Sequence, residues 1–418
     1  MSHLDHSHPD PSGGIVIVGA GLAGATAAES LRQEGFTGDL HLVAGERHAP
    51  YIRPPLSKEV LIGTAPRESA FVHDDDTWYA GVDVELILGD AATAVDREAR
   101  RVTLNSGRIL PYRRLLLTTG AAPRKLDVPG SDLDGIRYLR TIDDSDVLRE
   151  DLSGGGRNVV CVGSGWIGLE VTAAARVYGN EVTVVSPGAV PLGGALGDEL
   201  GAVFHGLHLE HGVVFRMETG VVGFTGSDGR VSGVVTSAGD TIPADLVVVG
   251  IGAVPNTGLA QAAGLEVDGG IVVDASLRTA DTAVFAAGDV ANAWHPTLDG
   301  RLRSEHWANA IDQGKAVARS MLGQALSYDV VPYFYTDQYD LGMEYAGFFT
   351  LARDAEVIYR GDVAGREFVA FWQRDGRVVA GMNVNVWDVN DGIKALVGSG
   401  RVIDAARLAD PSVPIGDL

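Results

Sequence analysis

Two glycine-rich hexads are the part of this sequence whose residue types and spacing most directly predict chemistry. Residues 19–24 read GAGLAG and residues 163–168 read GSGWIG, so both follow the pattern Gly-x-Gly-x-x-Gly. The first glycine of such a hexad allows a tight turn, the second lets the backbone approach a pyrophosphate, and the third lets a helix and a strand pack closely. A helix that begins at the hexad then offers free N–H groups to phosphates.

Both hexads stand in the context that this chemistry requires. An apolar run typical of a buried strand precedes each one, at residues 15–18 and 159–162. A helical pattern follows at 25–33 and 169–178, and a second short strand at 40–43 and 182–185. One hexad alone can be an ordinary turn, but two in βαβ units predict two bound dinucleotides and an enzyme that moves electrons between them. The expected contacts are Gly19, Gly21, Ala23 and Gly24 in the first hexad, and Gly163, Gly165, Ile167 and Gly168 in the second.

The elements that position these hexads indicate an α/β fold. Further strand-like runs lie at 82–88, 101–104 and 115–118, and a second set lies at 213–216, 233–236 and 246–249. This arrangement predicts two Rossmann-type domains, the second inserted in the first. After residue 328 aromatic residues become frequent, and strands at 368–372 and 378–386 followed by a helix near 392–397 predict a third, α+β domain.

Composition excludes several functions. The 418 residues include 55 acidic and 33 basic side chains, for a net charge of -22, which argues against nucleic acid or an anionic membrane as the main partner. Cys161 is the only cysteine, so an intrachain disulfide, a Cys-x-x-Cys redox centre and a multi-cysteine metal cluster are excluded, and no metal site is expected. We expect Cys161 to be a small buried apolar residue, so electrons must leave for an external acceptor.

The N-terminal residues predict no targeting segment. Residues 1–10 are polar and contain His3, His6 and His8, for which a solvated tail is favoured over a metal site. The longest uncharged run, 13–28, is shorter than the roughly 20 apolar residues of a membrane span and contains several glycines. We therefore expect a cytoplasmic protein.

At several motifs the chain resembles the FAD-dependent NAD(P)H:ferredoxin reductases of oxygenase systems. Besides the hexads, the motifs are RPPLSK at 53–58, RYLRT at 137–141, AAGD at 286–289, EHW at 305–307 and DQY at 337–339. The resemblance implies a glutathione-reductase-like arrangement. It assigns 1–118 and 253–328 to an FAD-binding domain, 119–252 to an NAD(H)-binding domain and 329–418 to a C-terminal reductase domain.

The resemblance also implies which residues contact FAD. Glu46 would bind the adenosine ribose, with a solvated loop acid as the alternative. Asp289 would bind a ribityl hydroxyl, with a helix N-cap as the alternative. Lys58 would stabilise charge on the reduced flavin as a catalytic residue, beside Trp307, for which a simple core role is the alternative. The remaining implied contacts are Arg53, Ala92 and Arg140, the last at the pyrophosphate.

The resemblance also implies contacts to the nicotinamide cofactor. It places Glu170 near the nicotinamide ring and adds Gly252 as a contact. The alternative for Glu170 is that its charge complements the helix dipole. Selectivity for NAD usually uses an acid after the second strand, and selectivity for NADP an arginine. Residues 186–192 contain neither. The missing base favours NADH, while NADPH stays possible.

The resemblance implies an iron–sulfur ferredoxin as electron acceptor. Because ferredoxins are usually acidic, docking on this acidic chain needs a local basic patch, for which Arg301, Arg303 and Lys315 are the candidates. Two alternatives use the same fold: an NAD(P)H oxidase or a quinone or radical reductase, and a slow redox-sensing flavoprotein. The oligomeric state is not predicted.

Overall fold

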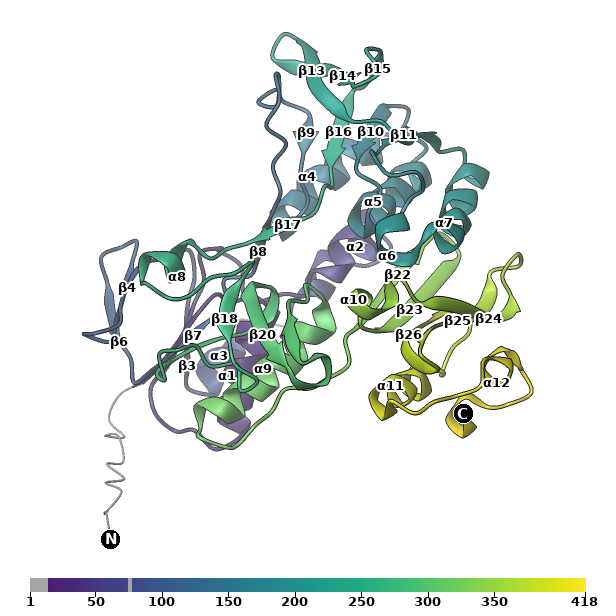
Figure 1. The fold of residues 1–418 in the computed structure, drawn as a ribbon. Helices are drawn as coiled ribbons and strands as arrows, with labels where there is room; N and C mark the ends of the chain where they lie inside the picture. The colour runs from purple at the N-terminus through teal and green to yellow at the C-terminus, as the bar shows by residue number, and fades with distance from the viewer. Residues whose placement is uncertain (1–13, 74–76) are drawn as a thin grey trace. The chain divides into compact units, whose positions relative to one another are not determined.

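A computed structural model describes residues 14–73 and 77–418, so the tail with His3, His6 and His8 lies outside the described residues. By its internal contacts the chain divides into two compact units (Figure 1). The first comprises the residues up to Ile52, Phe71–Ala121 and Pro255–Val330. The second comprises Arg53–Ala70, Ala122–Val254 and Val331–Leu418.

The first unit is built on a parallel five-stranded sheet. Its strand order is β19-β7-β1-β2-β3, with β1 at Ile15–Val18, β2 at Leu40–Val43, β3 at Val84–Ile87, β7 at Arg114–Leu117 and β19 at Val284–Ala286. Every residue of β1 is buried, as expected for a central parallel strand covered on both faces. Helices α1 (Leu22–Gln33) and α9 (Trp307–Met321) pack against each other in this unit.

The second unit contains a sheet of the same design. Its order is β12-β11-β10-β16-β9, all parallel, with β9 at Ile136–Arg137, β10 at Asn158–Val162, β11 at Glu181–Val185, β12 at Val214–Arg216 and β16 at Leu246–Val249. Helix α5 (Trp166–Val177) connects β10 to β11, and α7 (Asp198–Glu210) follows. The two sheets confirm the predicted pair of Rossmann-type domains.

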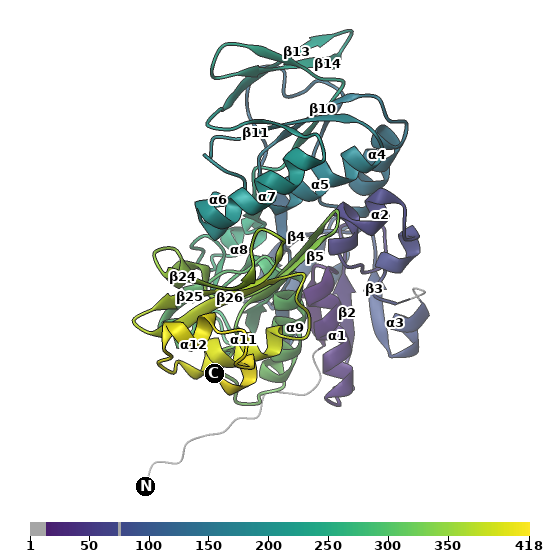
Figure 2. The ribbon, with the colours of Figure 1, turned by 90° about the vertical axis from the view of Figure 1, so that its right-hand side faces the viewer.

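The second unit also holds an antiparallel sheet near the C-terminus. Its order is β22-β23-β26-β25-β24, and the strands are Tyr333–Gln338, Leu341–Gly347, Arg377–Val384, Glu367–Arg374 and Glu356–Asp362. Helix α11 (Asn390–Ser399) packs on β26 and β23, and α12 (Ala405–Ala409) on β24, as Figures 1 and 2 show. This confirms an α+β arrangement after residue 328.

Smaller elements complete both units. Three-stranded antiparallel sheets are formed by β4 (Ala92–Asp96), β5 (Arg101–Leu104) and β6 (Ile109–Pro111), and by β13 (Val221–Ser227), β14 (Arg230–Thr236) and β15 (Thr241–Pro243). The other helices are α2 (Glu59–Ile62), α3 (Thr77–Gly81), α4 (Ile142–Ser153), α6 (Gly193–Leu196), α8 (Gly258–Ala262) and α10 (Phe349–Ala352), and the other strands are β8 (Ala121–Pro123), β17 (Ala253–Pro255), β18 (Ile271–Val273), β20 (Ala291–His295) and β21 (Gly300–Leu302). Within residues 14–73 and 77–418, every helix is too short or too polar to cross a bilayer.

Residues 53–70 lie in the second unit although their neighbours in sequence lie in the first. The reason is apolar packing: Leu61 is fully buried in one core with Leu148 and Val171. The hydroxyl of Tyr178 also donates to the carbonyl oxygens of Leu61 and Ile62, at 2.9 and 2.5 Å. This packing carries the RPPLSK motif to helix α5.

The helices after the hexads begin earlier than the sequence periodicity predicts. Helix α1 begins at Leu22 and α5 at Trp166, three residues before the predicted starts in both cases. Each helix starts directly after the second glycine of its hexad, which is the extended N-cap residue. The hexads are therefore the first turns of the helices themselves.

Candidate functional site

The first hexad folds into a cradle in which each glycine has a separate steric reason. Gly19 has φ +111°, and a Cβ on it would lie 2.2 Å from the carbonyl oxygen of Thr118 on the neighbouring strand segment. A Cβ on Gly24 would lie 2.0 Å from the oxygen of Gly19. A Cβ on Gly21 would meet nothing within 4 Å. The first and third glycines are thus required by packing, whereas the second borders open space at the N-terminus of α1, where a pyrophosphate fits.

The second hexad repeats this geometry. Gly163 has φ +104°, and its Cβ would lie 2.3 Å from the oxygen of Gly250, while a Cβ on Gly168 would lie 2.5 Å from the oxygen of Gly163. Gly165 again borders open space, because nothing lies within 4 Å of its Cβ position. Both cradles therefore have the shape that a dinucleotide needs. Near the second one, Ile167 is 46 % exposed, and Gly252 also borders open space.

The AAGD motif lies beside the first cradle. A Cβ on Gly288 would lie 2.9 Å from the Cβ of Ala23, so the motif and the hexad are in direct contact. The N–H of Gly288 donates to the side-chain oxygen of Gln313 at 2.8 Å. Asp289 lies inside the 3₁₀ turn Gly288–Val290, and strand β20 follows, which excludes the helix N-cap alternative. Gln313 is not predictable from the sequence, because an isolated glutamine in a helix carries no signal.

Close helix packing sets the position of Trp307. A Cβ on Gly314 of α9 would lie 2.8 Å from the carbonyl oxygen of Ala23, so this glycine lets α9 approach α1. Trp307 is the first residue of α9 and is 36 % exposed, which excludes the simple core role. An exposed indole next to the first cradle's helix is available for contact with a ring system.

The second unit joins Lys58 and Glu170 in a buried ion pair. Lys58 Nζ lies 2.9 Å from Glu170 Oε1, and only 8 % and 3 % of the two residues is exposed. Ser57 Oγ donates to Glu170 Oε2 at 2.5 Å, and Thr336 Oγ1 donates to Glu170 Oε1 at 2.6 Å. A buried pair persists when its remaining lone pairs are satisfied in this way. The sequence places Lys58 and Glu170 at different cofactors and does not predict that Ser57 and Thr336 contact Glu170.

Local structure explains how these side chains meet. Pro54 and Pro55 fix the backbone at the start of a 3₁₀ helix, Pro54–Ser57, which presents Ser57 and Lys58 next to α5. Glu170 is the fifth residue of α5 and therefore lies beyond the first turn. The helix dipole stabilises a charge mainly within the first turn. The Glu170 carboxylate accepts from three side chains, which disfavours the dipole alternative.

Aromatic and acidic side chains surround Lys58. Its Nζ lies 5.3 Å from the ring centroid of Tyr335, and burial raises the pKa of Tyr335 to about 12. Burial also raises the pKa of Asp337, an effect that Lys58 opposes. A cavity of about 290 Å³ is lined here by Tyr333, Tyr335, Asp337, Met343, Glu344 and Trp387. The cluster therefore combines the buried ammonium group of Lys58, the buried carboxylate of Glu170 and a cavity lined by aromatic side chains.

The other predicted contacts lie as follows. Arg53 Nη1 donates to the backbone oxygen of Arg140, so these two residues are neighbours in the second unit. Glu46 follows β2 and accepts a hydrogen bond from the buried hydroxyl of Tyr51, which holds its carboxylate. Ala92 is half-buried in β4.

At the end of β11, where a selectivity residue is expected, Ser186 is buried. Its hydroxyl accepts from Ser164 Oγ at 2.8 Å, so it is part of the hexad's internal packing. Its N–H donates to the backbone oxygen of Arg216 at 3.1 Å. Arg216 ends the neighbouring strand β12 and is exposed, so it is a charged residue at this edge that the sequence analysis missed.

The predicted basic patch is weaker than the sequence suggests. Arg303 forms an ion pair with Glu305, and Arg301 donates to the backbone oxygens of Val273 and Asn292, both at 3.0 Å. Lys315 is exposed on α9, and it forms no ion pair within residues 14–73 and 77–418. Its charge is the least compensated of the three.

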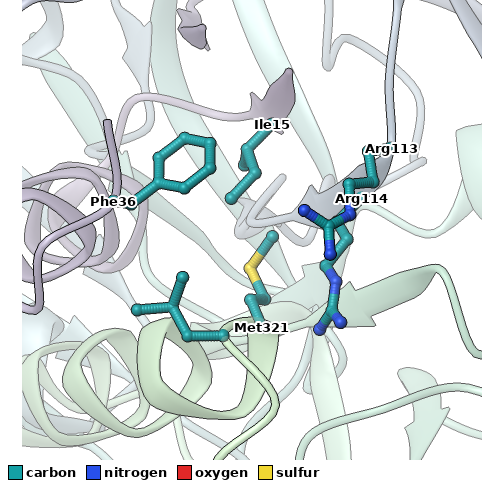
Figure 3. A pocket seen from close by; sticks show the side chains of 6 residues that line it. Ile15, Phe36, Arg113, Arg114 and Met321 are labelled. Atoms are coloured by element: carbon teal, nitrogen blue, oxygen red, sulfur yellow. The ribbon is translucent and has the colours of Figure 1, made fainter. Parts of the chain in front are cut away.

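A separate small pocket of about 100 Å³ lies at the opposite edge of the first sheet (Figure 3). It is lined by Ile15, Phe36, Arg113, Arg114, Met321 and Leu322. Ile15 and Arg114 are the first residues of β1 and β7, whereas the cradle follows the last residue of β1. The pocket is therefore not part of the dinucleotide site.

Comparisons with known proteins agree with this geometry. The model of the pyridine nucleotide-disulphide oxidoreductase family matches residues 13–314, and the reductase C-terminal model matches 333–418. The chain belongs to the pyridine nucleotide-disulphide oxidoreductase family. It is 42 % identical over 400 residues to the anthranilate 1,2-dioxygenase system ferredoxin–NAD(+) reductase component of Burkholderia cepacia, covering 96 % of this chain and 97 % of that one.

Two further relatives narrow the position within the family. Rhodocoxin reductase of Rhodococcus erythropolis is 42 % identical over 371 residues, covering 89 % of this chain and 86 % of that one. The reductase in the crystal structure of the covalent putidaredoxin reductase–putidaredoxin complex superposes with a TM-score of 0.92 at 35 % identity, covering 97 % of each chain. The predicted resemblance is confirmed: this chain is a flavoprotein oxidoreductase that uses FAD and NAD(P)H.

Proposed function

We propose that this chain transfers electrons from NADH through FAD to an iron–sulfur ferredoxin that feeds a monooxygenase or dioxygenase. The observation that carries the proposal is the combination of two cradles with a single, buried cysteine. A family member with one cysteine cannot store electrons in a disulfide, and burial raises the pKa of Cys161 to about 11, so it is not a reactive thiolate. The relative named as a ferredoxin–NAD(+) reductase component supports this acceptor.

Different residues of the chain are assigned to binding FAD, to binding the nicotinamide cofactor and to stabilising charge on the flavin. Bound FAD supplies the chemistry that accepts a hydride and releases single electrons. We propose that the first cradle with Asp289 and Glu46 holds FAD, and that the second cradle with Gly252 holds the nicotinamide cofactor. Arg140 would bind the pyrophosphate, Arg53 and Ala92 would contact FAD, and Trp307 would lie against the flavin ring. Lys58 beside the flavin stabilises negative charge there, and Glu170 holds the lysine in place.

Reduction of the flavin and its reoxidation are tested separately. Stopped-flow mixing with NADH measures the first step, and reoxidation by a panel of purified ferredoxins, oxygen and quinones measures the second. The proposal requires FAD, not FMN, to be released by acid, and at least one ferredoxin to outcompete oxygen and quinones. Fast reoxidation by oxygen or quinones alone would favour the oxidase or quinone-reductase alternative, and a long-lived reduced complex the redox sensor.

We further propose that NADH is preferred over NADPH. Ser186 offers no charge at the adenosine ribose edge, and an arginine in its place would disrupt the buried bond to Ser164. Arg216 is a cation at this edge, and it is exposed. A native tenfold preference for NADPH in kcat/KM, about 1.4 kcal/mol, that Arg216→Gln abolishes would contradict the proposal and identify Arg216 as the phosphate ligand.

For ferredoxin docking we propose a surface that includes Lys315, together with Arg301 and Arg303. The test compares Lys315→Glu with Lys125→Glu, an exposed-lysine control that follows β8. Reoxidation by ferredoxin should slow in the first variant and depend less on salt, while reduction by NADH stays unchanged. Equal effects of both variants would place docking elsewhere.

We also propose the cytoplasm as the location, and the domain limits 1–118 with 253–328, 119–252 and 329–418.

A further inference from the structure

A row of buried polar side chains leads away from Glu170 through the second unit. Thr336 Oγ1 lies 2.6 Å from Glu170 Oε1, and Gln338 Nε2 lies 3.2 Å from Thr336 Oγ1. His208 Nε2 lies 2.8 Å from Gln338 Oε1. The three side chains beyond Glu170 are all within 1 % of complete burial. Thr336 and Gln338 come from β22 and His208 from α7, so with Glu170 on α5 three elements contribute to one connected network.

The chemistry of each group fixes the direction of the hydrogen bonds. The Glu170 carboxylate pairs with Lys58 and accepts hydrogen bonds, so the hydroxyl proton of Thr336 points to it. The Thr336 oxygen must then accept from the amide N–H of Gln338. This leaves the amide oxygen of Gln338 to accept from His208, whose Nε2 therefore carries the proton. Every donor in the row points toward the Glu170 carboxylate.

Such a one-way row polarises its own members, because each hydrogen bond strengthens the next. We propose that His208 and Gln338 are positioning residues that, through Thr336, keep Glu170 ionised and thereby hold Lys58 for its role beside the flavin. The role of Lys58 rests on the proposed function, whereas the direction of the row does not. Burial lowers the pKa of His208 to about 4, which agrees with a neutral imidazole that donates from Nε2.

The other charged groups around the row are few. Lys58, Asp337 and the Tyr335 hydroxyl interact with Glu170, and His205 and His211 with His208. Tyr339 OH lies 3.5 Å from His208 Nδ1 and is influenced in turn by Arg176 and Cys161. Lys58 is the cation in hydrogen-bond range of Glu170 among the described residues, and through Thr336 the row meets the same carboxylate oxygen, Oε1.

The decisive experiment measures the pH dependence of flavin reduction by NADH in the holoprotein. Thr336→Val keeps the size of the side chain but removes the hydroxyl group that donates to Glu170. The loss of one hydrogen bond to a charged group changes the acid dissociation constant of that group by about tenfold. The acid limb of the profile should therefore move up by about one pH unit. His208→Phe and Gln338→Met should move it the same way by a smaller factor, and Thr336→Ser should restore the parent profile.

A matched control and an independent readout separate this role from a structural one. His205 lies on the same helix, packs on Phe215 and takes no part in the row, so His205→Phe should leave the profile unchanged. Nitrogen NMR of labelled histidine should show His208 neutral and protonated at Nε2, independently of any acceptor. An Nδ1-protonated or charged His208 at neutral pH would overturn the proposal. So would unchanged profiles in Thr336→Val and His208→Phe, or an equal shift in His205→Phe.

Discussion

Substituting Gly165 by alanine should weaken NADH binding without weakening the fold. Gly165 has φ -82° and ψ -177°, which alanine adopts without strain, and the added methyl group would meet no protein atom within 4 Å. Replacing glycine by alanine stabilises the fold by about 0.4–1 kcal/mol, because the unfolded chain loses conformational entropy. Alanine is also a poorer N-cap than glycine, and this destabilises the fold by a similar amount. We therefore expect the free energy of unfolding to change by less than about 0.5 kcal/mol.

The same methyl group would occupy the space that the pyrophosphate approaches. Displacing one phosphate oxygen from a backbone N–H costs about 1.5–3 kcal/mol, the value of a hydrogen bond to a charged group. This corresponds to an increase of about 10- to 150-fold in the apparent Kd for NADH, with roughly a factor of ten for each 1.4 kcal/mol. The FAD content should stay at that of the parent chain, because the first cradle is unchanged.

Gly168→Ala is the matched comparison. Its methyl group would lie 2.5 Å from the carbonyl oxygen of Gly163, so the packing of α5 on its strand must shift. Overpacking of this kind costs about 1–3 kcal/mol, and urea denaturation should show the loss even without NADH. Stopped-flow titration with NADH then measures binding in both variants. If Gly165→Ala binds NADH within twofold of the parent, or unfolds as easily as Gly168→Ala, the assignment of the open space to the pyrophosphate is refuted.

Other predictions follow from the same structure. Glu170→Gln should destabilise the fold by about 3–5 kcal/mol, because it leaves a buried lysine without its counter-charge, whereas Glu170→Leu combined with Lys58→Met should recover most of that loss in urea denaturation. The folded-state pKa of His208, about 4, lies below its ordinary value of 6.5, so its contribution to stability is complete above pH 6.5 and is lost as the pH falls toward 4. Between pH 6.5 and 5 the parent chain should lose about 2 kcal/mol more stability than His208→Phe; equal losses would show that His208 titrates normally. Gly21→Ala should give a stable protein with reduced FAD content, whereas Gly24→Ala, whose methyl would lie 2.0 Å from the oxygen of Gly19, should lose stability and FAD together.

The sequence by itself determined the features that are encoded locally. A buried strand, a glycine hexad and an amphipathic helix are contiguous, so their order predicts two Rossmann units, and β1 and β2 have the predicted limits. The helix starts were predicted late, because the residues of the hexad itself already form the first turn. A single cysteine excluded a disulfide mechanism by count alone.

Only the tertiary structure decided which distant side chains meet. Ser57 and Glu170 are 113 positions apart, and Thr336 lies a further 166 positions from Glu170, so no local pattern relates them. Their contact depends on Leu61 packing into the core of the second unit and on β22 lying against α5. Likewise the neutralisation of Arg303 by Glu305 and the burial of Ser186 changed what their residue types suggested. The charge and spacing of residues in the sequence indicate which side chains could belong to a site. The packing of apolar surfaces determines which of these side chains are paired, buried or exposed.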